Sequence, residues 1–471
     1  MDCPPSKIYQ VRSSDNETFG ISERAIEESV TLRNLIFSTA STHSNENRDT
    51  TIPIPKVSGN ILKLVIEWCE IEKNEAEESE FPNSEWKTKM LNLNHQELTD
   101  VVFAANYLDI APLLDYSCGV VAGLGKKQGP SELSNIFKVE TSDTGKEHAK
   151  FLIPLTELPW VIMHNIIKQF DATALFFLHL LSPTMPILLT KLVDAPTTCN
   201  WCWLETSVVV TISRGEDELQ LEVLLQQPEQ KTGSNASKVT DKTRIRIGSF
   251  IFHVYRKEMA QKDTWIFESV DDTVSRYDSL KQLTDILFDT FHPEVHNAIA
   301  LRFNKRNFLF MKKYTKDFKD LTVANRIPMY ETELKFLFDK INVENISLGF
   351  VFNVERYHGV FRQKTFRAYG AWITLENILT MKCSEFDIHT CLLPLDTIDE
   401  IFAAWRTDRV SHFKRLSIEF YEPFEACDIL PGIAFEPEFV DDDGDDLHLQ
   451  RADGKKLDIT VTGKTVVLDF L

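Results

Sequence analysis

The sequence predicts an α+β protein of several domains, and three observations lead to this class. The chain has 471 residues, enough for about three average domains. Its hydrophobic fraction of 43% and its 32 Phe residues can fill large cores. Strand-like and helix-like segments alternate at the start, helical periodicity dominates residues 96–181, and strand-like segments return from residue 207.

The charge balance disfavours nucleic acids and anionic membranes as partners. There are 51 Lys+Arg against 71 Asp+Glu, a net charge of −20 that repels phosphate groups. The N-terminus lacks a signal-peptide pattern, and the apolar run 174–189 is too short and too interrupted by proline to span a bilayer. The eight scattered cysteines are typical of small buried side chains in a reducing compartment. We therefore expect a soluble cytoplasmic and/or nuclear protein.

Helical patterns in the first third of the chain suggest a surface built from helices. Two amphipathic helices are expected over 96–107 and 113–124. The sequence Gly129-Pro130-Ser131 begins a further helix, with Leu133, Ile136 and Phe137 on its apolar side. Residues 140–150 are predicted to be a linker because they show no apolar periodicity.

The motif Ala-Ala-Asn-Tyr-Leu-Asp-Ile at 104–110, followed by Leu113-Leu114-Asp115, resembles the Skp family of SCF ubiquitin-ligase adaptors. Further matches follow in order between residues 7 and 139, although the final Trp-containing helix of the family is missing. The resemblance implies a BTB/POZ-like α/β domain with C-terminal helices over residues 1–139, in which Asn106 and Tyr107 face a cullin. It also implies an F-box groove formed by Leu114, Cys118, Val121, Leu133, Ile136 and Phe137.

Residues 151–171 resemble the first half of an F-box, the helical motif that Skp adaptors bind. The second half departs from the family, since Pro183 and Pro186 stand where a Ser with basic residues is usual, and the two prolines should shorten the last helix. The resemblance implies a helical F-box over 151–190. Its implied contact residues are Leu158, Pro159, Ile162, Ile166 and Phe170.

The region 200–471 mixes strands and helices. Helix–strand pairs at 334–352, 375–389 and 398–420 favour parallel strands with crossover helices. Their strands begin about 40 and then about 32 residues apart, which indicates an irregular, leucine-rich-like arrangement. Residues 331–421, with Trp372 and Trp405, resemble the F-box-associated domain of nematode F-box proteins. This resemblance implies a substrate-recognition region with no chemistry of its own.

A physical argument connects the adaptor-like region with the F-box-like region. A helix with one apolar side needs a groove that removes that side from water. A short tether gives an effective concentration on the order of millimolar. We therefore expect residues 1–139 to bind the F-box of the same chain, with binding to separate Skp or F-box proteins left open.

No motif predicts a metal site, and we expect no cofactor. Cys199 and Cys202 form a CxxC pair without further nearby ligands, so they are interpreted as two buried thiols. His292 and His296 are separated by a proline, and the acidic run 441–446 does not fit a calcium loop. Residues 302–319 hold seven Lys/Arg against one acid, which suggests a solvated face or a contact with an acidic partner.

The sequence thus predicts a non-catalytic adaptor and substrate receptor of an SCF-type ubiquitin ligase, bridging a cullin to an unknown target protein. No Walker loop, GxSxG motif or catalytic triad points to an enzyme. The main alternative is a pseudo-adaptor that occupies its own groove and sequesters cullin or other partners. Two further alternatives are an enzyme built on the strand-rich region and two neighbouring reading frames joined into one.

Overall fold

The computed structural model describes most of the chain and divides it into two compact units. The first unit is Met1–Ala195 with Leu283–Phe291, and the second is Pro196–Gln282 with His292–Leu471. The described residues are 7–42, 51–74, 84–138, 153–182, 184–192, 197–225, 242–259, 262–270, 275–324, 329–350, 357, 359–369, 372–424, 446–451 and 453–471. The predicted linker 140–150 and most of the acidic run 441–446 lie outside these ranges.

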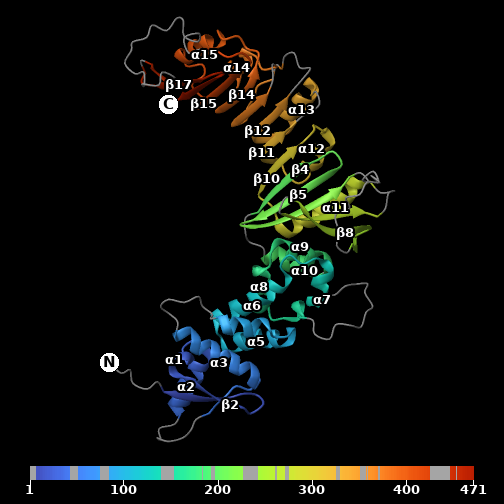
Figure 1. Ribbon diagram of the computed structural model, residues 1–471, viewed down its shortest axis with the longest axis vertical. Helices are drawn as coiled ribbons and strands as arrows, with labels where there is room; N and C mark the ends of the chain where they lie inside the picture. Colours follow the sequence, from blue (N-terminus) through green and yellow to red (C-terminus); the bar gives the residue numbers. More distant parts are fainter. Residues whose placement is uncertain are drawn as a thin grey trace. The chain divides into compact units, whose positions relative to one another are not determined.

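The first unit begins with a small three-stranded sheet covered by helices. Its strand order is β2-β1-β3, with β1 antiparallel to β2 and parallel to β3. Figure 1 shows this part in blue, with α1 and α3 beside the strands. The bounds are β1 Ile8–Arg12, β2 Thr18–Ser22, α1 Glu23–Ile26, α2 Val30–Thr42, β3 Ile52–Pro53, α3 Gly59–Asn74 and α4 Ser84–Leu91.

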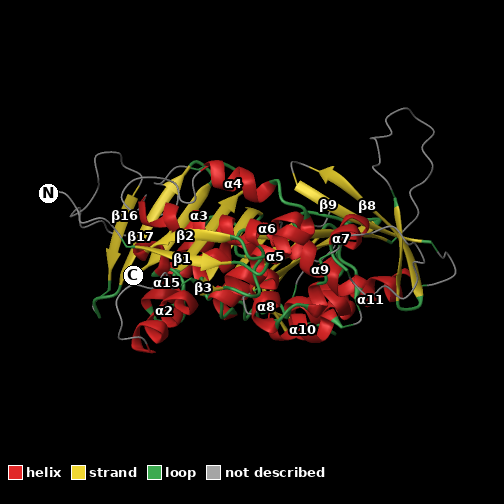
Figure 2. Cartoon of the chain, turned by 90° about the horizontal axis from the view of Figure 1, so that it is seen from below, coloured by secondary structure: helices red, strands yellow, loops and turns green. Residues whose placement is uncertain are grey.

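Helices make up the rest of this unit, as the colours of Figure 2 show for the run from α5 to α10. Each start has a local cause: Asn94 and Glu97 form a capping box at α5, Pro130 stands at the first turn of α7, and Asp171 caps α9. The bounds are α5 His95–Leu108, α6 Ala111–Gly125, α7 Pro130–Ile136, η1 Leu155–Glu157, α8 Trp160–Gln169, α9 Ala172–Leu181 and α10 Met185–Leu192.

The second unit contains one large mixed sheet. Its fifteen strands follow the order β16-β17-β18-β15-β14-β13-β12-β11-β10-β4-β5-β6-β9-β8-β7. The strand bounds are β4 Thr198–Trp203, β5 Ser207–Arg214, β6 Asp217–Leu224, β7 Thr243–Ile247, β8 Phe250–Met259, β9 Lys262–Ser269, β10 Val295–Ala300, β11 Asp317–Val323, β12 Asn342–Phe350, β13 Thr365–Tyr369, β14 Glu385–Cys391, β15 Arg415–Phe420, β16 Asp446–Gln450, β17 Lys456–Thr462 and β18 Thr465–Phe470.

The middle of this sheet is a run of parallel strands with crossover helices. Strands β4 and β10 to β15 pair in parallel, and Figure 1 shows α12–α15 along one side of them. Register places Phe366, Phe386 and Leu416 opposite one another on the buried face. The helix bounds are α11 Arg276–Phe291, α12 Lys305–Met311, α13 Glu331–Lys340, α14 Leu375–Thr380 and α15 Thr397–Arg406.

The parallel run is more regular than the sequence suggested. Strands β10 to β15 begin at 295, 317, 342, 365, 385 and 415, so neighbouring starts are 22, 25, 23, 20 and 30 residues apart. The expected spacing of about 40 residues was wrong because β13 lies between the two predicted strands. β13 has only two buried side chains, Phe366 and Ala368, which is too short an alternation to recognise.

The strand-like segment 245–254 is not one continuous strand. It is a hairpin of β7 and β8, and Gly248 occupies the left-handed region at φ +58° in the turn. A residue with no Cβ adopts this conformation at no steric cost. Gly463, at φ +57°, likewise lies in the turn between β17 and β18, which pair as an antiparallel hairpin.

Arg451, at the end of β16, joins the C-terminal hairpin to α15. Its guanidinium donates to the carbonyl of Trp405 and, at 3.0 Å, to Oδ1 of Asp408. Lys455 also donates to Asp408 Oδ1, at 2.7 Å. The hydrogen bond from Lys455, followed by that from Arg451, lowers the pKa of Asp408 to about 2.

We predict that Asp408→Asn lowers the melting temperature at pH 7. Asn tolerates the positive φ of this position, +66°, so the change removes charge without backbone strain. The carboxyl group has a lower pKa folded than unfolded, so its stabilisation is present above about pH 4 and is lost as the pH falls toward 2. Thermal unfolding from pH 7 downward should show the difference from the unchanged chain closing below pH 4. Asp217→Asn is the control, and a difference that does not change with pH would contradict the assignment.

A helical groove and the helix it holds

Helices α6 and α7 form a wall of apolar side chains in the first unit. Cys118 and Val121 on α6, Leu133 on α7 and Phe137 after it are buried, and Leu114 is only 9% exposed. Ile136, the sixth residue predicted for the groove, is half-buried, and its carbonyl accepts a hydrogen bond from the amide of Ile153 at 2.9 Å. Five of the six predicted groove residues are therefore buried, and the sixth contacts Ile153 through its backbone.

Helix α8 packs against α6 with its apolar side. Ile162, Met163, Ile166 and Ile167 recur at helical spacing and are all buried, whereas Val161 is 53% exposed. Figure 1 shows α8 next to α6 and α10. Burying an Ile or Leu side chain stabilises by about 1.5–3 kcal/mol, so this stripe gives α8 a stability that a ten-residue helix lacks in water.

Phe170, directly after α8, closes one end of the groove. Its ring meets that of Phe137 edge to face, with centroids 5.4 Å apart and planes at 90°. Gly125, the last residue of α6, leaves room for both rings: a Cβ there would lie 2.9 Å from Phe170 Cε1 and 3.1 Å from Phe137 Cε2. The aromatic contact therefore requires glycine at position 125.

Polar contacts fix the position of α8 and α9 along the groove. The carboxylate of Asp171 accepts from the amide of Ala174, which caps α9, and from the amide of Lys127, beyond the end of α6, at 2.8 and 2.7 Å. Gln169 Nε2 donates to the carbonyl and the carboxylate of Asp115 at 3.0 and 3.1 Å. The bond to Ala174 satisfies an amide in the first turn of α9 that has no partner within the helix.

A short backbone pairing connects the two sides before α8 begins. Phe137 and Ile153 form an isolated parallel bridge, in which Lys138 N donates to Ile153 O at 2.8 Å. An exposed ion pair between Lys138 and Glu157, at 2.6 Å, lies next to this bridge. Exposed ion pairs contribute little to stability. We therefore attribute the alignment of Phe137 with Ile153 to the backbone hydrogen bonds.

The residues predicted from the F-box resemblance do not all lie in the interface. Leu158, Ile162, Ile166 and Phe170 are buried, but Pro159 is exposed. Pro159 instead stands at the start of α8, where its carbonyl accepts from the amide of Met163 at 3.0 Å. Pro159 therefore acts at the start of α8, and its assignment as an F-box residue stays a prediction.

Helix α9 is buried on all sides, a feature that the sequence reasoning missed. Residues Ala172 to His179 are all buried, and α9 packs against α7. The segment Leu283–Phe291 of α11 belongs to the same unit, and its Thr290 Oγ1 lies 2.7 Å from His179 Nδ1. Burial lowers the pKa of His179, and the nearby charge of Asp289 opposes this shift. In the sequence, the pattern that could have indicated this complete burial is an apolar run with a single histidine.

Asn106 and Tyr107 lie at the C-terminal end of α5, and both are half-buried. Phe103, three and four residues earlier and 39% exposed, shares their helix face. The carbonyl of Tyr107 accepts from Thr31 Oγ1 at 3.1 Å, and Lys56 Nζ lies 5.2 Å from the centre of its ring. This face is therefore held by contacts with α2 while its side chains still reach solvent.

The cysteine and histidine motifs meet in the sheet, where the pairing of β4 with β10 sets His296 opposite Cys199. Cys199 and Cys202 lie on opposite faces of β4, and burial raises the pKa of both thiols. Burial, with a smaller effect of Asp115, also raises the pKa of Cys118 in the groove to about 12. Within the described ranges, no cluster of three His, Cys, Asp or Glu side chains could hold a metal ion. Over the same ranges, the model contains no helix with the length and apolarity needed to cross a membrane.

Comparisons with known proteins match the part of the chain that builds this groove's unit. A family model described as "Skp1 family, tetramerisation domain" matches residues 7–74. Suppressor of kinetochore protein 1 of Schizosaccharomyces pombe is 33% identical over 153 residues, which cover 30% of this chain and 91% of that protein. The E3 ubiquitin ligase complex SCF subunit sconC of Talaromyces marneffei is 30% identical over 146 residues, covering 29% and 88%.

Gly125→Ala tests the aromatic contact at the end of the groove. The added methyl group would overlap Phe170 and Phe137, so we expect a loss of about 1–3 kcal/mol in unfolding free energy. Gly123→Ala is a matched control in the same helix, because nothing lies within 4 Å of its Cβ position. The control should be neutral or stabilising by up to about 1 kcal/mol. Chemical denaturation measures both, and equal effects would contradict the packing described.

Proposed function

Because the chain belongs to the Skp1 family, we propose that it is an adaptor subunit of an SCF-type ubiquitin ligase that also carries its own substrate receptor. The family match and the SCF subunits among the relatives support the adaptor role. In this proposal the chain is non-catalytic and acts in the cytoplasm and/or nucleus. It holds a target near a ubiquitin-charged enzyme and so raises the local concentration, while other subunits perform the chemistry.

The cullin-binding surface in this proposal is the face of α5 that carries Asn106 and Tyr107. Both side chains are half-buried, and Phe103 beside them is an exposed aromatic residue. An aromatic group with nearby amide and hydroxyl donors is typical of the centre of a protein interface. The backbone is held from behind by Thr31, so a partner would meet a fixed surface.

The observation that carries the proposal is the packing of α8 against α6 within the first unit. We propose that residues 151–190 act as an F-box bound in cis. Three contacts support this role: the buried stripe on α8, the Phe137–Phe170 contact and the Asp171 carboxylate that accepts from the Lys127 amide. The second unit then becomes the substrate-recognition region, and its target is an unidentified protein.

The occupied groove also favours a second function, the pseudo-adaptor. A groove filled by its own chain leaves its apolar wall unavailable to separate F-box proteins. Such a chain could bind cullin without delivering a target. The two functions differ in outcome, since an active receptor increases the recovery of ubiquitin conjugates with the complex and a sequestering protein decreases it.

Cleavage of the full chain tests the cis interaction. With a protease site introduced between residues 140 and 150, the two halves should remain together in size-exclusion chromatography. Ile166→Asp places a carboxylate in the groove at a cost of at least about 2 kcal/mol. The halves of this variant should separate at concentrations at least about tenfold higher than those of the unchanged chain.

Val161→Asp is the control for this cleavage experiment, because Val161 is on the same helix and 53% exposed. It should leave the association unchanged. Separation of the unchanged halves at micromolar concentration, or equal effects of the two variants, would contradict cis binding. Circular dichroism of the uncut variants checks that the helices are retained.

Asn106→Lys and Tyr107→Lys test the adaptor role separately. Each places a long cation on the proposed cullin face, and we expect the recovery of a co-expressed SCF-type cullin to fall at least about tenfold. Asn135→Lys, an exposed change on α7, is the matched control and should not alter recovery. Full recovery with both α5 variants would remove the assigned surface.

A further inference from the structure

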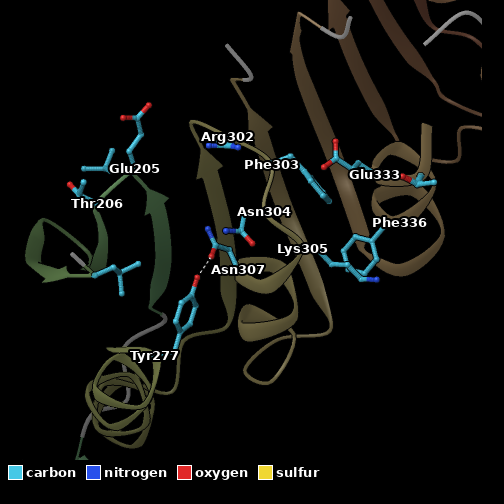
Figure 3. A pocket seen from close by; sticks show the side chains of 13 residues that line it. Glu205, Thr206, Tyr277, Arg302, Phe303, Asn304, Lys305, Asn307, Glu333 and Phe336 are labelled. Atoms are coloured by element: carbon cyan, nitrogen blue, oxygen red, sulfur yellow. Dashed lines mark hydrogen bonds between the residues drawn. The ribbon is translucent and has the colours of Figure 1, made fainter. Parts of the chain in front are cut away.

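The second unit contains a cavity of about 840 Å³ at the carboxyl ends of two parallel strands. Leu204–Thr206 follow β4 and Arg302–Asn304 follow β10, so both loops open at the same edge of the sheet. This edge is where parallel α/β sheets commonly bind ligands. Residues at the start of α13 complete the wall (Figure 3).

Two amides in this cavity have fixed orientations. Asn304 Oδ1 accepts from the backbone amide of Arg306 at 2.9 Å, and Asn307 Oδ1 accepts from the hydroxyl of Tyr277 at 2.6 Å. Asn307 is only 7% exposed. Because each oxygen is already bonded, each NH2 group is left to donate, and neither has a partner among the described residues. The cavity therefore presents oriented hydrogen-bond donors.

Cations add to these donors. Arg302 and Lys305 line the cavity, and neither forms an ion pair with any described carboxylate. Lys305 Nζ lies 5.3 Å from the centre of the Phe336 ring, a cation–π contact that leaves its three N–H groups available. Arg306 stacks on Tyr277, with Cζ 3.9 Å from the ring centre, and holds the tyrosine that orients Asn307.

The two carboxylates that line the cavity do not cancel this donor set. Glu333 accepts from the backbone amide of Tyr330 at 2.9 Å, which commits it to the start of α13. The carboxylate of Glu205 points away from Asn304 and Asn307 (Figure 3). Two other cations on the parallel strands are paired, Arg367 with Asp387 at 2.9 Å and Arg415 with Asp469 at 3.3 Å. Arg302 and Lys305 thus give the cavity two cations without an ion-pair partner among the described carboxylates.

We propose that this cavity binds an acidic side chain of a target protein, with Arg302 and Lys305 supplying positive charge along its wall and the amide of Asn307 supplying a hydrogen-bond donor. This inference rests on the proposed receptor function and names the chemistry of its ligand. Charge-assisted hydrogen bonds to a carboxylate or phosphate are the strong contacts that such donors form. The rings of Phe303 and Phe336, 6.1 Å apart, add an apolar wall for the residues beside the acidic one.

A peptide array tests the proposal with the full chain. Peptides share apolar flanks and carry Asp, Glu, phosphoserine, Asn, Gln or Ser at one fixed position. We expect retention of the acidic peptides over their neutral counterparts by at least about fivefold. Retention of Asp and Glu peptides identifies a carboxylate ligand, and retention of phosphoserine alone identifies a phosphate. Equal retention of acidic and neutral peptides would overturn the proposal.

Two variants locate the binding. Lys305→Glu should reduce retention at least about tenfold, whereas Lys319→Glu, the same change on an exposed strand position outside the cavity, should not. Asn307→Asp keeps the acceptor for Tyr277 but replaces the NH2 donor by a carboxylate oxygen, and it should also abolish the acid preference. Equal effects of Lys305→Glu and Lys319→Glu would overturn the site. Recovery of the cullin by the unchanged chain is measured in parallel. If the chain recovers no cullin but still prefers acidic peptides, the result counts against the adaptor role and not against the cavity.

Discussion

The burial of one side of α8 against α6 is the interaction on which the rest of the first unit depends. A ten-residue helix does not persist in water by propensity alone, so α8 exists because its isoleucines leave solvent. The same packing places Asp171 where it can cap α9 and accept from the Lys127 amide. Through α9 it extends to His179 and Thr290, so a segment distant in sequence is tied to the groove.

This constraint links the two proposed roles of the chain. In an adaptor with an open groove, receptors can exchange, and specificity changes with the receptor bound. When the receptor segment is covalently attached, the entropic cost of association falls and exchange is suppressed. One polypeptide would then carry a fixed pairing of cullin surface and target surface. Whether that pairing delivers or withholds a target is a property of the assembled complex, which is why both functions follow from the same packing.

The sequence predicted what depends on periodicity and missed what depends on single residues or distant contacts. Helical spacing correctly identified α5 and α6. The groove residues Cys118, Val121 and Leu133 came from the family resemblance; they are buried, and their role as a groove stays a prediction. Gly125 and Asp171 carry no periodic signal, since one acts by lacking a side chain and the other by bonding two backbone amides. For the cavity, the sequence indicated only that the basic segment 302–319 could contact an acidic partner. It did not indicate that α12 and β11 divide this segment and bury several of its aromatic rings.

Hydrogen exchange of the full chain, followed by mass spectrometry at increasing denaturant, tests the central claim most directly. If α8 is stable only within the groove, the amides of residues 160–169 and 111–125 should lose protection together, in one cooperative step. Exchange of residues 160–169 at the rate of an unfolded chain, while 111–125 remain protected, would show that the groove does not hold this helix.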